Sequence, residues 1–305
     1  MTQGLVEVHA APARREDELL RRSFTRFLRA EGISPTTVQR YELSVRQFQE
    51  FARDTGFPLQ VTREHVAHFL ERRRQDHAAN TARNDYMALS RYFKWLVEEG
   101  EVRENPMIHV KPPPLQEHLP RPYTADEVRA MLRVCQGKDP QSLRDRAIIL
   151  VLVDTGLRAS EFCSLKVADV DLNAEHIIVR GKRGKERLVR LGYKAQAAID
   201  RYLRHRRSHL SDLWVGRRGE PLQPNGLFQL IERIAKRAGV ANPGVHRFRH
   251  TAATWMRDKG IQTQELMYLL GWSTHKMAER YTHSTGAERA LRAHREYSPA
   301  DNLPL

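Results

Sequence analysis

The sequence predicts a mainly α-helical protein of two domains, with a small antiparallel sheet in the second domain (an α+β fold). Apolar residues recur every three or four positions along most of the 305 residues, which is the spacing of one buried helix face. β-branched runs flank a glycine-containing turn within residues 176–191, the pattern of a hairpin. A proline tract at residues 111–114 separates two patterned halves, each long enough to bury its own core.

The first half is predicted to form four helices. Their apolar stripes fall within residues 24–28, 38–48, 66–70 and 86–96, and each stripe covers one face of a helix. Breaks fall at residues 32–35, 56–58 and 77–80, and Gly100 closes the last helix. We expect these four helices to pack as a small bundle.

The domain boundaries follow from the next break. Asn105-Pro106 stops the helical pattern, and the prolines that follow stiffen the chain. An ordinary surface loop is the alternative, but the helical pattern restarts cleanly beyond it. The expected segments are a flexible N-terminus at 1–15, a helical domain at 16–108, a proline-rich linker at 109–120, a second domain at 121–298 and a tail at 299–305.

The second domain begins with a predicted capping box, in which Thr124 and Glu127 satisfy first-turn amides reciprocally. A helix is expected from there to about Arg133, and another over residues 143–153. Strands are expected at 176–180 and 187–191, around a turn at 181–186. Helical spacing returns over residues 194–209 and again from Leu227 onward.

Charge and composition narrow the class of protein. The net charge of +14 and the pI of about 10.1 predict attraction to a polyanion. Residues 180–207 carry eleven Lys or Arg against Glu186 and Asp200; a solvated helix face is the alternative interpretation of this run. Two cysteines exclude a disulfide framework. No signal peptide or membrane-length apolar run is seen, so we expect a cytoplasmic protein.

A set of six residues in the second half suits phosphoryl transfer to a tyrosine: Arg158, Lys182, His246, Arg249, Trp272 and Tyr281. A tyrosine can act as a covalent nucleophile, although its free pKa of about 10 means that it needs activation. Arginine forks match the non-bridging oxygens of a phosphate. Each residue alone has an ordinary structural explanation, and the prediction rests on their combination.

Metal binding is the alternative use of His246 and His250, which have the spacing of a ligand pair on a helix. Arg247 and Arg249 would repel a divalent cation, and neither a metalloprotease motif nor a cysteine partner accompanies the pair. We therefore expect no metal and no other cofactor.

The order of these residues resembles the tyrosine recombinase (phage integrase) family over nearly the whole chain. The match is carried by Thr155-Gly156-Leu157-Arg158-Ala159-Ser160-Glu161, by the turn from Gly181 to Arg187, by His246-x-x-Arg249, and by Tyr281 nine residues after Trp272. Most members carry histidine where this chain has Trp272. Tryptophan offers one N–H donor and no acceptor, so it cannot shuttle a proton.

The resemblance implies a role for each residue. Arg158 and Arg249 would clamp the scissile phosphate, with Trp272 as a third donor. His246 would handle the proton of the nucleophile Tyr281. Lys182 would be the general acid, with Lys185 as the second-ranked alternative.

The implied fold is a SAM-like core-binding domain followed by the recombinase catalytic domain, in a Xer-like two-domain layout. The implied function is site-specific DNA recombination through a 3′-phosphotyrosyl intermediate, in integration, excision or dimer resolution. A type IB topoisomerase-like nicking–closing enzyme and a catalytically inactive DNA-binding relative are the alternatives. Residues expected to contact DNA are Thr37, Arg40, Thr81, Arg83, Asn84, Lys94, Lys185, Arg187 and Arg247.

The implied partners are double-stranded DNA with paired inverted sites and three further copies of the chain, or a related recombinase, in a tetramer on DNA. No membrane partner is expected. The corresponding location is the cytoplasm, associated with the nucleoid, in a prokaryote or a mobile genetic element.

Overall fold

The computed structural model describes residues 10–55, 61–76, 79–114, 121–181 and 184–275, together with Ala278. The chain divides into two compact units, residues 1–118 and 119–305. This division falls inside the segment expected to be the linker. Each unit has its own hydrophobic core, as the length of each half requires.

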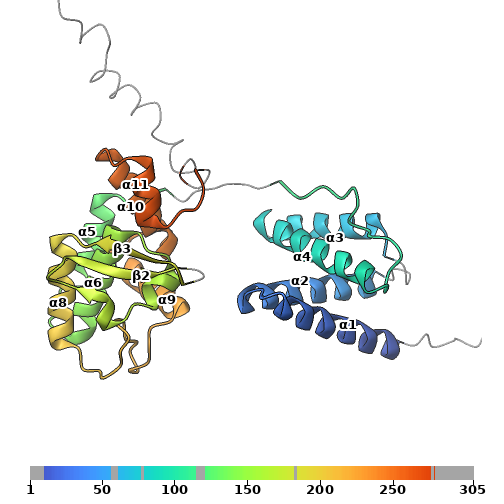
Figure 1. Ribbon diagram of the computed structural model, residues 1–305, viewed down its shortest axis with the longest axis horizontal. Helices are drawn as coiled ribbons and strands as arrows, with labels where there is room; N and C mark the ends of the chain where they lie inside the picture. The colour runs from blue at the N-terminus through green and yellow to red at the C-terminus, as the bar shows by residue number, and fades with distance from the viewer. Residues whose placement is uncertain are drawn as a thin grey trace, which may run out of the picture. The chain divides into compact units, whose positions relative to one another are not determined.

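The described part of the first unit contains four helices, as predicted (Figure 1): α1 (Ala10–Ala30), α2 (Pro35–Asp54), α3 (Arg63–Asp76) and α4 (Ala79–Glu98). Ser34 caps α2 by accepting a hydrogen bond from the backbone N–H of Thr37, and Pro35 occupies the first turn. The predicted flexible N-terminus of 15 residues was too long, because α1 already begins at Ala10. Residues 1–9 lie outside the described residues.

Aromatic side chains fill the core of this bundle. Phe24 contacts Tyr92 edge-on and Phe48 contacts Phe69 in the same way. A buried polar link supports them, since the Asp85 carboxylate accepts hydrogen bonds from Ser44 Oγ at 2.6 Å and Arg73 Nε at 2.7 Å. Because a buried carboxylate is costly without partners, these bonds fix the packing of α2 and α3 on α4.

The second unit begins with α5 (Ala125–Arg133), and the predicted capping box is present: Glu127 N–H donates to Thr124 Oγ1, and Thr124 N–H donates to the Glu127 carboxylate. The next helix, α6 (Pro140–Thr155), starts three residues earlier than predicted. Asp139 caps it by accepting hydrogen bonds from the N–H groups of Gln141 and Ser142. Gly156 ends α6 in the left-handed conformation, with φ +59°.

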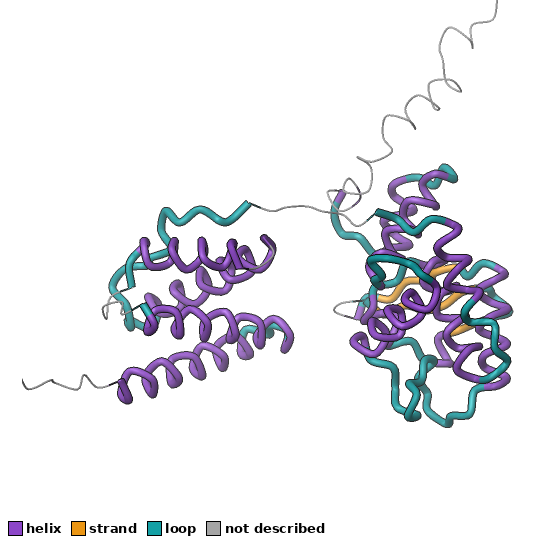
Figure 2. The backbone as a smooth tube through the Cα atoms, turned by 180° about the vertical axis from the view of Figure 1, so that it is seen from behind, coloured by secondary structure: helices purple, strands orange, loops and turns teal. Residues whose placement is uncertain are grey.

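A short helix, α7 (Ala159–Cys163), and a 3₁₀ turn (Val167–Asp169) follow, and the sequence pattern had indicated neither. The predicted hairpin is confirmed as β2 (His176–Arg180) and β3 (Glu186–Arg190). A short strand that was not predicted, β1 (Val170–Asp171), pairs antiparallel with β2. Within the described residues these strands form a sheet ordered β1-β2-β3, with helices of the same unit around it (Figure 2).

Four more helices complete the described part of this unit: α8 (Tyr193–His205), α9 (Pro224–Ala238), α10 (Val245–Asp258) and α11 (Thr263–Leu270). Helix α8 ends four residues before the predicted end. The continuous helical region expected from Leu227 is divided, because Gly239, Gly260 and Gly271 have positive φ angles. Helix α6 packs against α8 and α10, and α5 against α9. No helix among the described residues is long and apolar enough to cross a membrane.

Candidate active site

The turn after α6 presents Arg158. Gly156 adopts a left-handed backbone conformation, and an added Cβ there would lie 2.8 Å from Leu270 Cδ2 and 2.9 Å from Ala252 Cβ. Leu157 is buried, while Arg158 is the residue that precedes α7. The glycine therefore reverses the chain against residues of α10 and α11, and Arg158 reaches the end of α11.

Glu161 pairs with Arg158. Arg158 Nη1 donates to Glu161 Oε1 at 2.8 Å, and the Arg158 backbone N–H donates to Oε2 at 3.2 Å. Burial alone would raise the pKa of Glu161, but the hydrogen bonds and charges of Arg187 and Arg158 hold it below its usual value. The carboxylate thus stays ionised and fixes the rotamer of Arg158.

The second predicted phosphate-binding arginine, Arg249, lies on α10 and is 2% exposed. Its Nη1 donates to the carbonyl of Gly156 at 2.9 Å, and its Nη2 donates to the carbonyl of Leu270 at 2.6 Å. The guanidinium carbon lies 5.6 Å from the centre of the Trp272 ring. Arg249 therefore joins three of the chain segments that carry predicted site residues.

Three consecutive carbonyls at the end of α11 each accept a hydrogen bond from a different arginine. Leu269 accepts from Arg187 Nε at 2.9 Å, Leu270 from Arg249, and Gly271 from Arg158 Nη2 at 2.8 Å. The C-terminal end of a helix carries partial negative charge and attracts cations. Helix α11 therefore gathers three guanidinium groups and sets both predicted phosphate-binding arginines in place.

His246 is the second residue of α10 and is exposed. Partial burial lowers its pKa from the usual 6.5, and the positive charges of Arg249, His250 and Arg158 lower it further. The imidazole is therefore held in its neutral form near neutral pH, and a neutral imidazole can accept a proton.

Trp272 is 7% exposed and follows the end of α11. Its backbone N–H bonds to the carbonyl of Met267 at 2.9 Å, and the N–H of Gly271 bonds to Tyr268 at 3.1 Å, which together form a Schellman end. Trp272 thus lies next to Arg249, one of the two predicted phosphate-binding arginines. Lys182 and Tyr281, the predicted general acid and nucleophile, lie outside the described residues.

Two residues predicted to contact DNA form ion pairs within the second unit. Arg247 is 3% exposed: it pairs with Glu127 at 2.8 Å, donates to the Arg121 carbonyl at 2.9 Å and stacks 3.9 Å from the Tyr123 ring centre. Arg187 directs all three guanidinium nitrogens to Glu161 and Leu269. Both guanidinium groups are engaged within the protein, so we now expect neither of them to contact DNA.

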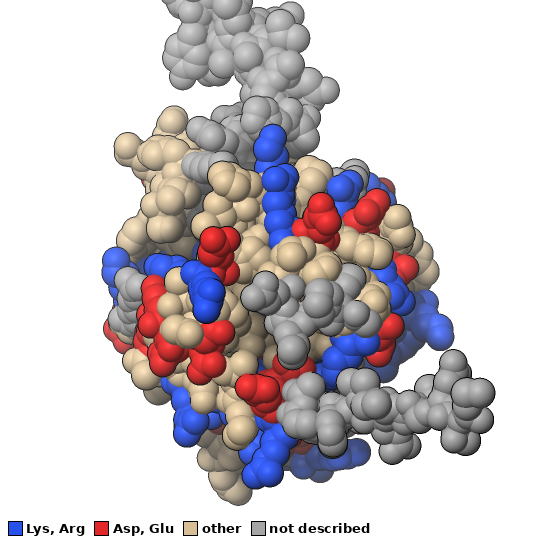
Figure 3. Space-filling view, turned by 90° about the vertical axis from the view of Figure 1, so that its right-hand side faces the viewer, with Lys and Arg blue, Asp and Glu red and all other residues tan. Residues whose placement is uncertain are grey.

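The other candidate DNA contacts remain predictions. Arg40, Lys94 and Lys185 are exposed, while Thr37, Thr81, Arg83 and Asn84 are half-buried. Arg83 also donates to the carbonyl of Pro113 at 2.8 Å. On the face shown in Figure 3, basic and acidic side chains are interspersed among the described residues, so the net charge of +14 is not concentrated on that face.

The sequence did not predict the ion pair of Arg187 with Glu161 or the part played by the three carbonyls of α11. The carbonyls belong to the backbone, which no side-chain pattern can reveal. Arg187 did leave a signal, because it shares the inward face of β3 with the buried Val189. A charged residue at an inward position indicates a buried partner, which here is Glu161.

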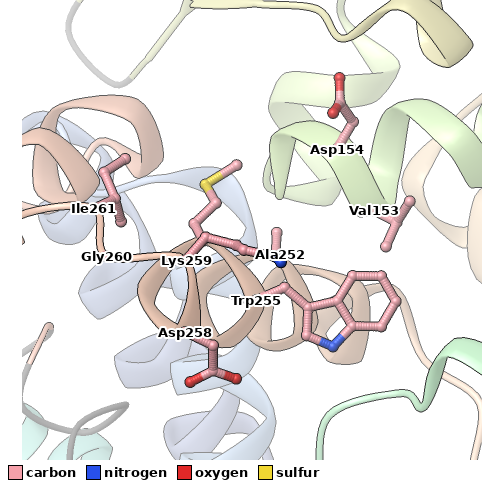
Figure 4. Close-up of a pocket in the computed structure, with 9 residues that line it drawn as sticks. Val153, Asp154, Ala252, Trp255, Asp258, Lys259, Gly260 and Ile261 are labelled. Carbon is pink, nitrogen blue, oxygen red and sulfur yellow. The ribbon is translucent and has the colours of Figure 1, made fainter. Parts of the chain in front are cut away.

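A separate groove of about 860 Å³ lies between the end of α6 and α10 (Figure 4). It is lined by Val153, Asp154, Ala252, Trp255, Met256 and the residues 258–261. None of the predicted site residues lines it. No group of three or more potential metal ligands is found in the part of the chain that the structure describes.

Comparison with known families shows the family to which the chain belongs. A model described as "Phage integrase family" matches residues 122–288, and one described as "Phage integrase, N-terminal SAM-like domain" matches residues 20–100. The chain belongs to the phage integrase family. Its class and fold are therefore those predicted: a SAM-like helical domain followed by an integrase catalytic domain.

Relatives with curated names are tyrosine recombinases. The chain is 33% identical to tyrosine recombinase XerC 2 of Ralstonia nicotianae, covering 90% of this chain and 86% of the relative. It is 30% identical to tyrosine recombinase XerD of Halalkalibacterium halodurans, covering 86% and 92%. The protein is thus an enzyme of the tyrosine recombinase class, which breaks and rejoins DNA strands.

Solved structures share the fold. A lambda integrase dimer bound to a COC′ core site superimposes with a TM-score of 0.73 at 21% identity, covering 92% of this chain and 83% of that chain. XerH recombinase bound to palindromic difH substrate in a post-cleavage complex gives a TM-score of 0.71 at 22% identity, covering 87% and 81%.

Proposed function

We propose that this integrase-family enzyme uses Arg158 and Arg249 as the phosphate clamp and Tyr281 as the nucleophile. The observation that carries the proposal is the anchoring of both arginines to adjacent carbonyls, Gly271 and Leu270, at the end of α11. Two guanidinium groups held by one helix end have a fixed separation. Such preorganised donors stabilise charge in a transition state without reorganising.

The reaction is a transfer of the phosphodiester from a deoxyribose oxygen to a phenol. Tyr281 Oη attacks the scissile phosphorus, His246 accepts the phenolic proton, and the bond to the 5′ oxygen breaks. Lys182 gives its proton to that oxygen, which leaves as a 5′-hydroxyl. The product is a 3′-phosphotyrosine, and attack by a 5′-hydroxyl of another strand reverses each step.

The lowered pKa of His246 supports its part in this scheme, because an imidazole that is neutral at neutral pH has a lone pair ready for a proton. Trp272 packs against Arg249 and contributes one N–H donor. Positioning and electrostatic stabilisation supply the catalysis, so the proposed reaction uses neither metal nor ATP.

The substrate is proposed to be double-stranded DNA with paired inverted binding sites, occupied by four protomers. XerH is bound to a palindromic site in its structure, and a lambda integrase tetramer is bound to a Holliday junction in another. The net charge of +14 suits such a polyanionic partner. Association with the nucleoid in the bacterial cytoplasm follows from such a substrate.

A strand-exchange assay tests the proposed function. Two duplexes of different length carry a site that the protein has selected from a random DNA library. We expect a four-way junction and then recombinant lengths, with neither metal nor ATP added. A nicking–closing enzyme would relax supercoiled DNA carrying the same site but form no junction, and that result would contradict the proposal.

A further inference from the structure

The structure assigns Arg187 as a positioning residue that holds Arg158 in its phosphate-binding geometry, acting through Glu161 and through the end of α11. This inference rests on the proposed function, because it concerns the clamp named there. Arg187 is on β3, far in sequence from both α7 and α11, and its side chain is 9% exposed.

Glu161 is shared between the two arginines. Arg187 donates from Nη2 to Oε2 at 2.9 Å and from Nη1 to Oε1 at 3.3 Å, while Arg158 donates to Oε1 at 2.8 Å. Arg187 thus meets the carboxylate with both terminal nitrogens and fixes its plane. The oxygen that receives Arg158 is fixed with it, so the position of one guanidinium depends on the other.

A second link runs through α11. Arg187 Nε donates to the carbonyl of Leu269, two residues before Gly271, whose carbonyl accepts from Arg158. A Cβ added at Gly271 would lie 3.0 Å from Arg187 Nη1 and 3.4 Å from Arg158 Nη1. The absence of a side chain at this position therefore lets both guanidinium groups approach the end of the helix.

Arg187 also keeps Glu161 charged. Burial favours the neutral acid, and the hydrogen bonds and charge of Arg187 oppose this effect and lower the pKa. Without Arg187, the buried Glu161 carboxylate would be paired with Arg158 alone. The position of Arg158 would then be less restrained. Holding the Glu161 carboxylate in one plane requires the planar guanidinium of Arg187, because lysine offers a single point charge.

Cleavage of two substrates by the full-length protein tests the assignment. One substrate carries an ordinary scissile phosphate and the other a methylphosphonate, in which a methyl group replaces one charged non-bridging oxygen. A residue that neutralises the phosphate charge matters less for the second substrate. The measured quantity is the ratio of the two single-turnover cleavage rates, which does not depend on how much of a preparation is folded.

Arg158→Gln defines the effect of losing the clamp, and we expect it to lower the phosphate-to-methylphosphonate ratio by about 10²-fold. Arg187→Gln should lower the same ratio by about tenfold or more, and Arg187→Lys should recover part of that loss. Arg190→Gln is the matched control, since Arg190 is on the same strand, also pairs with a glutamate (Glu175), and is 80% exposed. Its ratio should equal that of the wild type.

Each outcome is decisive. If Arg187→Gln slows both substrates equally while Arg158→Gln changes the ratio, Arg187 is merely structural and the inference is overturned, but the clamp stands. If Arg187→Gln weakens binding of both substrates and leaves their cleavage ratio unchanged, Arg187 contacts DNA and the inference also fails. If Arg158→Gln itself leaves the ratio unchanged, the proposed clamp is wrong and the inference falls with it.

Discussion

Arg249 donates a hydrogen bond to the carbonyl of Gly156 at 2.9 Å, so one buried side chain ties α10 to the turn that presents Arg158. The two predicted phosphate-binding arginines are thus coupled through the backbone as well as through α11. A change in the turn should therefore disturb both arginines, even if neither is altered.

Gly156→Ala tests this coupling. The left-handed backbone should cost about 1 kcal/mol in the free energy of unfolding. The new Cβ would lie 2.8 Å from Leu270 Cδ2, and such overpacking adds about 1–3 kcal/mol. We also expect slower DNA cleavage, because the turn must shift away from α10 and α11. Denaturant unfolding and single-turnover cleavage measure the two effects.

Gly239→Ala is the matched control. Gly239 ends α9 with φ +68°, and an added Cβ would meet nothing within 4 Å. It should lose about 1 kcal/mol of stability and retain the wild-type cleavage rate. Equal losses of stability in the two variants would show that contacts around Gly156 do not matter.

The cleavage rate should fall at low pH as His246 becomes protonated, and this fall is the acid limb of the pH profile. A general base must be neutral, and an imidazole is neutral above its pKa in the folded protein. Because that pKa lies below the usual 6.5, cleavage should persist below pH 6.5 and fall on further acidification. His246→Gln should remove this limb, whereas His250→Gln should keep it. A limb centred above pH 6.5, or unchanged in His246→Gln, would contradict the assignment.

Arg247→Gln should reduce stability and leave DNA affinity unchanged. The change removes the buried partner of Glu127, which keeps only the exposed Arg121 as an ion-pair partner, and breaking a buried pair commonly costs about 3–5 kcal/mol. Arg129→Gln removes the same charge from an exposed pair with Asp126 and should cost less than about 1 kcal/mol. If Arg247→Gln lowers affinity for the selected duplex at full stability, the structural role is wrong.

The two lysines of the hairpin turn can be separated chemically. Lys182→Ala should cleave normal DNA very slowly but recover on a substrate whose 5′-bridging oxygen is replaced by sulfur, because a thiolate leaves without protonation. Lys185→Ala should lose affinity, with a shallower dependence of binding on salt, and show no recovery. Recovery of the Lys185 variant alone would move the general acid to that residue.

Much of the fold could be predicted from local patterns. The helix boundaries at Ser34, Thr124 and Gly156 follow from capping chemistry that acts within a few residues. Helix α7 and strand β1 escaped prediction because five and two residues are too short to show a period. Tertiary packing, rather than local propensity, holds them.

The candidate site residues could be named from the sequence, but the hydrogen bonds and ion pairs between them could not. Arg158, Arg249 and Trp272 lie together at the end of α11, and the charges of both arginines act on His246. The ion pairs of Arg187 and Arg247 were not predicted, because net charge does not distinguish a basic side chain in solvent from one paired in the interior. That distinction depends on partners more than 20 residues away, such as Glu161 and Glu127.

The most direct test of the account is to trap the covalent intermediate and locate it. The full-length protein is mixed with a selected duplex that is nicked near the cleavage site, so that the released fragment diffuses away, and the adduct is resolved on a denaturing gel and mapped by mass spectrometry. The account predicts one protein–DNA adduct, attached through Tyr281, and none with Tyr281→Phe at undiminished DNA binding. An adduct that survives in Tyr281→Phe, or that maps to Tyr268 or Tyr297, would contradict it.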